Sequence, residues 1–213
     1  MCRRINVKMK KMRYINSFCY CSTIDEFLEL DQKKWLQAMK ENYSYVTPYD
    51  LNQKQIDAWK DEYDVLHRQL GKTVRANKKY GKLQIIFEYV LWDFDNENGV
   101  RPDVILLSAD RIGIIEFKTR SIDDDSYQYV TSQAKKYRHR FLHNHDESKN
   151  MKLGTVALMT SMKDYYEIRG RVKCISPDRF EDVKETLMGR YPSPHKDVWR
   201  WINSDYHFPE KNL

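Results

Sequence analysis

Two short apolar runs near the middle of the chain constrain its fold more than any other feature. Residues 104–107 read Val-Ile-Leu-Leu and residues 112–115 read Ile-Gly-Ile-Ile, with the polar tetrapeptide Ser-Ala-Asp-Arg between them. Short runs rich in apolar and β-branched residues, separated by a polar break, are typical of two strands joined by a turn. The sequence therefore predicts a β-hairpin within residues 100–120.

Charged side chains stand at one end of this predicted hairpin. Pro102 and Asp103 precede the first run, and Glu116, Phe117 and Lys118 follow the second. Because side chains alternate along a strand, Glu116 and Lys118 project from one face and Phe117 from the opposite, buried face. Closing the hairpin brings Asp103 alongside Glu116, where two hard carboxylate groups suit Mg²⁺, with Mn²⁺ as a substitute. Lys118 would then lie beside the metal, in a position to orient a water molecule or hold a phosphate.

A helix predicted over residues 127–143 carries a second set of polar side chains. Gln133 and Tyr137 are four residues apart and therefore share one face of the helix, which could meet the hairpin. Apolar residues recur at helical spacing and predict a face that packs on a sheet. These residues are Tyr129, Val130, Ala134, Tyr137 and Phe141. The basic residues on the remaining surface are candidates for nucleic-acid contacts, namely Lys135, Lys136, Arg138 and Arg140.

Three short motifs together resemble those of a known family. Residues 101–103 (Arg-Pro-Asp), residues 116–118 (Glu-Phe-Lys) and the pair Gln133-x-x-x-Tyr137 resemble the PD-(D/E)xK nuclease superfamily, in particular its RecB-like branch. The segment around Glu88 also looks like the strand before the hairpin in bacterial nuclease-like domains fused to helicase-type ATPases. The resemblance covers roughly residues 50–160, and the hairpin with the following helix is its specific part.

This resemblance implies a fold and a set of residue roles. The implied fold is a restriction-endonuclease-like α/β core, with a central mixed β-sheet flanked by helices. The implied roles are metal binding by Asp103 and Glu116 with Glu88 as an additional acidic residue, and catalysis by Lys118. Gln133 and Tyr137 would help to arrange the site or contact DNA. The resemblance further implies a Mg²⁺-dependent DNA nuclease, with RNA open as an alternative substrate.

Two other functions are compatible with the same residues. The first is a catalytically inactive, nuclease-fold module that binds nucleic acid and acts with a separate helicase or ATPase. The second is an unrelated interaction domain whose hairpin is lined by acids. The intact pair of acids with a lysine favours the enzyme, because charged groups within an apolar strand are costly unless they are paired or bind a metal.

The rest of the chain predicts further helices and strands. One helix is marked by apolar residues from Ile24 to Met39, and a second runs from Leu51 to Leu70 and ends at Gly71. Strands are expected within residues 83–92, 153–159 and 171–175, and a last helix begins at residues 177–178. We expect residues 1–50 to form a basic N-terminal segment with a helical elaboration, and residues 51–213 the nuclease-like domain, as one compact unit. Glu62, on the second helix, could reach the site from the flank as in some related nucleases, but we expect it to be exposed.

Composition and cysteine usage bear on location and partners. Lys and Arg number 37 against 31 Asp and Glu, giving a net charge of +6, which modestly favours a polyanionic partner. The four cysteines are few and scattered in a chain of 213 residues, which argues against a disulfide-stabilised secreted scaffold. No apolar run approaches the roughly 18 residues that a membrane span requires. The sequence thus predicts a cytoplasmic protein without a membrane partner.

Overall fold

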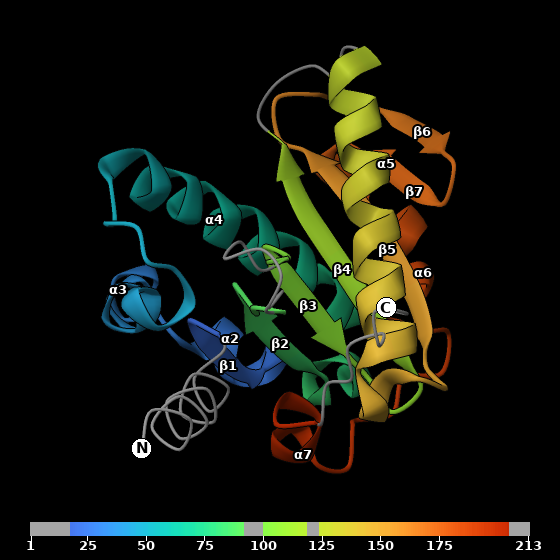
Figure 1. The fold of residues 1–213 in the computed structure, drawn as a ribbon, viewed down its shortest axis with the longest axis horizontal. Helices are drawn as coiled ribbons and strands as arrows, with labels where there is room; N and C mark the ends of the chain where they lie inside the picture. The colour runs from blue at the N-terminus through green and yellow to red at the C-terminus, as the bar shows by residue number, and fades with distance from the viewer. Residues whose placement is uncertain (1–17, 92–99, 119–123, 205–213) are drawn as a thin grey trace, which may run out of the picture.

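The computed structural model describes residues 18–91, 100–118 and 124–204, and a seven-stranded sheet forms the centre of this described part (Figure 1). The strands are β1 (Tyr20–Thr23), β2 (Gln84–Phe87), β3 (Val104–Leu107), β4 (Arg111–Lys118), β5 (Lys152–Met159), β6 (Tyr166–Arg169) and β7 (Val172–Ile175). Their order across the sheet is β1-β2-β3-β4-β5-β7-β6. The pairs β4–β5 and β5–β7 are parallel and the other four are antiparallel. The sheet is therefore mixed, as predicted.

Helical elements surround this sheet. The α-helices are α2 (Ile24–Glu29), α3 (Gln32–Val46), α4 (Gln53–Ala76), α5 (Asp124–His139), α6 (Lys184–Met188) and α7 (Val198–Ile202). Shorter helical segments are η1 (Lys78–Lys82), the π-helical turn η2 (Arg140–Asn144), η3 (Asp146–Ser148) and η4 (Pro177–Val183). The predicted basic segment before residue 18 lies outside the described residues, whereas the N-terminal helices α2 and α3 are confirmed.

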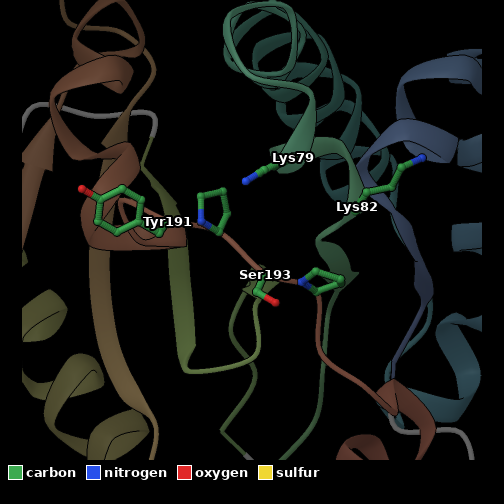
Figure 2. Close-up of a pocket in the computed structure, with 6 residues that line it drawn as sticks. Lys79, Lys82, Tyr191 and Ser193 are labelled. Atoms are coloured by element: carbon green, nitrogen blue, oxygen red, sulfur yellow. The ribbon is translucent and has the colours of Figure 1, made fainter.

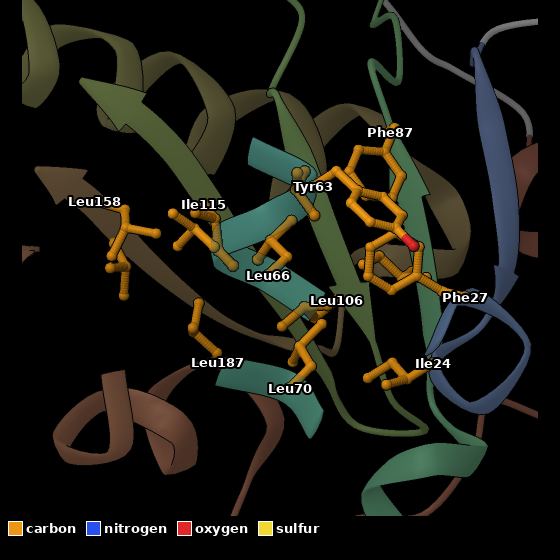
Figure 3. Packing of buried hydrophobic residues seen from close by; sticks show 14 of the residues in the cluster. Ile24, Phe27, Tyr63, Leu66, Leu70, Phe87, Leu106, Ile115, Leu158 and Leu187 are labelled. Atoms are coloured by element: carbon orange, nitrogen blue, oxygen red, sulfur yellow. The ribbon is translucent and has the colours of Figure 1, made fainter. Parts of the chain in front are cut away.

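Helices cover both faces of the sheet (Figure 1). On one face, Leu66 and Leu70 of α4 lie in a large apolar cluster with Leu106 of β3 and Ile115 of β4 (Figure 3). On the other face, residues of α5, η2 and α7 join a second cluster that includes Tyr137. The central strands are therefore buried on both faces.

The helical region before β2 is divided in a way that the apolar spacing does not predict. Thr23 and Glu26 form a capping box at the start of α2, and the side chain of Asp31 accepts a hydrogen bond from the backbone of Lys34 at the start of α3. Asp31 has extended backbone angles, so it separates the two helices. The prediction of one continuous helix from Ile24 to Met39 was therefore wrong.

The second predicted helix is longer than expected. It continues through Gly71 to Ala76, because Thr73 and Val74 extend its buried face beyond the glycine. A glycine within a helix costs roughly 0.5–1 kcal/mol relative to alanine, and burial of the following turn can offset that cost. The prediction that Gly71 ends the helix was wrong.

Two glycines allow α6 to approach the sheet closely. Gly113 of β4 and Gly154 of β5 are register partners, and a Cβ atom at Gly113 would lie 2.2 Å from the carbonyl oxygen of Leu187. A Cβ at Gly154 would lie equally close to the carbonyl oxygen of Thr186, at 2.2 Å. Because backbone atoms are in the way, a side chain at either position must displace α6.

We expect Gly113→Ala to destabilise the protein, because overpacking against backbone typically costs about 1–3 kcal/mol. Urea unfolding followed by circular dichroism would measure the change. Gly71→Ala is a matched control, since a Cβ there has ordinary contacts, the nearest atom lying 3.6 Å away. That control should stabilise the helix by roughly 0.5–1 kcal/mol. Equal effects of the two substitutions would contradict the proposed close approach.

Candidate active site

The strand ends place the predicted site residues at one edge of the sheet. β3 is antiparallel to both β2 and β4, so the start of β3 lies at the same edge as the ends of its two neighbours. Asp103 directly precedes β3, Glu88 directly follows β2, and Glu116 and Lys118 belong to the end of β4. The backbone of Glu88 donates a hydrogen bond of 2.9 Å to the carbonyl oxygen of Asp103. Four residues separated in sequence are thereby brought together.

Backbone amides hold the two central carboxylates in place. The amide of Phe117 donates to Oδ2 of Asp103 at 2.8 Å, and the amide of Asp103 donates to Oε1 of Glu116 at 3.4 Å. Each of the two carboxylates therefore accepts a hydrogen bond from a backbone amide of the opposite arm of the hairpin. Glu116 is buried, whereas Asp103 keeps partial access to solvent. An ion or a substrate phosphate could therefore approach from the Asp103 side.

Lys118 lies on the solvent-accessible side of these carboxylates. Its Nζ is 3.2 Å from Oε2 of Glu116, and its side chain is 24% exposed. Burial opposes the charged ammonium, but the carboxylates of Glu116 and Asp103 outweigh it and raise the pKa of Lys118 above its ordinary value. Lys118 therefore provides a positive charge that is accessible to solvent.

Tyr137 and Gln133 approach the same carboxylate from α5. The hydroxyl of Tyr137 donates a hydrogen bond of 2.7 Å to Oε1 of Glu116, and Nε2 of Gln133 lies 3.5 Å from that hydroxyl. Tyr137 is completely buried, so it fixes Glu116 from behind and has no access to a polymer. Burial, followed by the Glu116 and Asp103 charges, raises the pKa of Tyr137, which keeps the hydroxyl protonated as a donor.

Glu88 lies next to these groups, but its carboxylate has internal partners. Its Oε1 accepts a hydrogen bond of 2.8 Å from the indole of Trp59, with Nε2 of Gln55 at 3.4 Å, and its Oε2 pairs with Nε of Arg101 at 2.8 Å. Glu88 also has a positive φ of 55°, which is uncommon for a residue with a side chain. These partners place the Glu88 carboxylate between α4 and Arg101.

Glu62 of α4 is a buried member of the site, and its predicted exposure was wrong. The residue is 5% exposed, and its Oε2 is buried with no hydrogen-bond partner among the described residues. Burial, followed by the nearby charges of Asp103, Glu88 and Glu116, raises the pKa of Glu62 well above its ordinary value. Helical spacing contained a signal for this placement, since Glu62 lies three residues after Trp59 and four before Leu66 on the buried face.

Acidic groups outnumber basic groups at this sheet edge. Among the described residues, the acids are Glu62, Glu88, Asp103 and Glu116, and the bases are Arg101 and Lys118. Burial raises the pKa of Glu88 to about 7, and burial together with the Asp103 charge raises that of Glu116 to about 8. Full ionisation would leave an excess of two negative charges, which a divalent cation would neutralise.

The donor chemistry suits Mg²⁺ or Mn²⁺. Asp103 and Glu116 provide hard carboxylate oxygens, and the buried Oε2 of Glu62 has no hydrogen-bond partner in the described part of the chain. Within residues 18–91, 100–118 and 124–204, no three His, Cys, Asp or Glu side chains already form a group that could hold a metal ion. An ion would accordingly rest on Asp103 and Glu116, with water and phosphate oxygens as its other ligands, and Mg²⁺ accepts such a set.

The predicted nucleic-acid contacts lie on α5 and the π-helical turn that follows it. Lys135 and Lys136 are exposed, whereas Arg138 and Arg140 are partly buried. None of these four side chains belongs to the hydrogen-bonded group around Glu116, so any contribution to binding would come from the surface beside the site.

A shallow cavity occurs at the opposite end of the sheet (Figure 2). It is lined by Lys79, Lys82, Tyr191, Pro192, Ser193 and Pro194. η1 leads into the start of β2, and Pro194 bridges to Ser108 just after β3, which places this cavity away from Asp103 and Glu116. The cavity is therefore separate from the acidic group.

No protein-family model and no curated protein matches the chain. No helix among the described residues is long and apolar enough to cross a membrane. The functional inference consequently rests on the residues of the site.

Proposed function

We propose that the protein is a metal-dependent nuclease that hydrolyses phosphodiester bonds in DNA, with a restriction-endonuclease-like core of the RecB-like PD-(D/E)xK type. The observation that most supports this proposal is that Asp103 and Glu116 lie side by side at the ends of two central strands. Lys118 contacts Glu116 from the solvent side. The helix with Gln133 and Tyr137 supports the same proposal, because it holds Glu116 from behind.

Each residue has a defined role in the proposed reaction. A bound Mg²⁺ would supply Lewis-acid activation of water and of the phosphate. Asp103 and Glu116 would hold that ion, and the Lys118 ammonium would orient the attacking water or stabilise the charge that develops on the phosphate. Tyr137 fixes the carboxylate orientation, which maintains the geometry that hydrolysis requires.

The proposal includes DNA as the substrate and Mg²⁺ as the cofactor, with RNA and Mn²⁺ as their alternatives. Lys135, Lys136, Arg138 and Arg140 are proposed to contact the phosphate backbone beside the site. A separate helicase or ATPase is a proposed partner.

Cleavage assays with Lys118→Ala test this function. We expect wild-type protein to cleave linear, circular or single-stranded DNA only with Mg²⁺ or Mn²⁺, and the variant to be slower by about a hundredfold or more. Lys152→Ala is a matched control, because Lys152 is 68% exposed and pairs with Asp110 at the other end of the sheet.

Cleavage and binding measurements together distinguish an enzyme from a binding module. Cleavage that survives Lys118→Ala unchanged would contradict the assignment of this site. DNA binding that persists in EDTA, with no cleavage in either metal, would instead show the inactive nuclease-fold alternative.

A further inference from the structure

One face of α5 leads from solvent down to the carboxylates. Tyr129, Gln133 and Tyr137 are spaced four residues apart, so they follow one another along the helix. Tyr137 is completely buried on Glu116, Gln133 is partly buried, and Tyr129 is 60% exposed. The outermost residue of this series is thus an aromatic ring in contact with water.

The Tyr129 ring lies beside the proposed catalytic lysine. Nζ of Lys118 is 5.7 Å from the centroid of this ring, within the range of a cation–π interaction. The same ammonium thus lies close to both the Glu116 carboxylate and the tyrosine ring. A strand whose phosphate lies at Lys118 therefore brings its neighbouring base within reach of Tyr129.

We propose that Tyr129 is a stacking platform for an unpaired base next to the reacting phosphate, so that the site selects single-stranded nucleic acid. The proposal rests on the proposed nuclease function, since it requires the strand to reach Lys118. Every base offers an aromatic face for such stacking, but in a continuous duplex neighbouring bases cover those faces. An exposed ring beside the site therefore favours single strands or frayed ends over closed duplex.

Lys135 and Lys136 of α5 are exposed. Their positive charges attract a polyanionic strand to the helix that carries Tyr129.

Equilibrium binding without divalent metal tests the proposal independently of cleavage. The probes are a fluorescent single-stranded oligonucleotide, a blunt hairpin duplex of the same sequence, and an abasic sugar–phosphate chain of equal length. We expect Tyr129→Ala to weaken binding of the base-containing single strand by roughly tenfold, and to change binding of the abasic chain little. Tyr129→Phe should retain wild-type affinity, because the ring is kept.

Tyr191→Ala is the matched control, since Tyr191 is 85% exposed and lines the cavity at the opposite end of the sheet. It should leave all three affinities unchanged. Equal weakening for the abasic chain and the single strand, or a larger loss for the duplex, would overturn the stacking proposal even if the protein cleaves DNA. A loss confined to base-containing single strands would support it even if no cleavage is observed.

Discussion

Asp103→Asn is expected to reduce metal-dependent DNA cleavage by about a thousandfold or more, which corresponds to about 4 kcal/mol of transition-state stabilisation. The substitution removes one of two proposed anionic ligands and half of the central carboxylate charge. It preserves shape, and the asparagine carbonyl oxygen can still accept the hydrogen bond that the Phe117 amide now donates to Asp103. The loss should therefore come from chemistry and not from unfolding.

Initial cleavage rates over a range of Mg²⁺ and Mn²⁺ concentrations would measure this effect, with thermal unfolding as a check on the fold. Asp110→Asn is the matched control, because Asp110 is exposed at the other end of the hairpin and pairs with Lys152. A rate for Asp103→Asn within tenfold of wild type at saturating metal would show that Asp103 does not bind the catalytic ion.

The central part of the site was predictable because it depends on local rules. Alternation along one strand places Glu116 and Lys118 on the same face, and closure of a hairpin brings Asp103 beside them. Helical periodicity likewise places Gln133 and Tyr137 together. These relations hold for any chain that forms the predicted elements.

Other parts of the site depend on tertiary packing. Glu62 looked like an exposed helical acid, and its burial follows from how α4 lies on the sheet. Glu88 was predicted as an additional acid at the metal site, but its positive φ and its partners Trp59 and Arg101 could not be predicted. Sequence spacing carries no information about such a turn.

Some strands of the fold likewise depend on tertiary packing and not on local sequence. The central strands were predictable from continuous apolar runs, because both of their faces are buried. The edge strands β1 and β6 were not predicted, since each has four residues, partly or largely exposed, and no apolar run marks it. Their pairing is fixed by neighbouring strands more than by their own composition.

The excess of buried carboxylates has a consequence for stability. A carboxyl group whose pKa is raised by folding binds more protons in the folded state than in the unfolded state, so stability falls as pH rises. For Glu116 this window extends from the ordinary value of 4.5 to about 8, and for Glu88 from 4.5 to about 7. Metal-free protein should therefore lose stability as pH rises across this window.

Urea unfolding at a series of pH values, with EDTA or with Mg²⁺, would measure this dependence. Mg²⁺ should flatten it, because an ion that binds ionised carboxylates in the folded state stabilises that state by mass action. Glu116→Gln should flatten the pH dependence of stability without metal, and it should remove much of the stabilisation by Mg²⁺. Glu185→Gln, at an exposed position on α6, is the control and should change neither quantity. A metal-free stability that rises through this window would contradict the charge imbalance, and with it the physical reason for expecting a cation between Asp103 and Glu116.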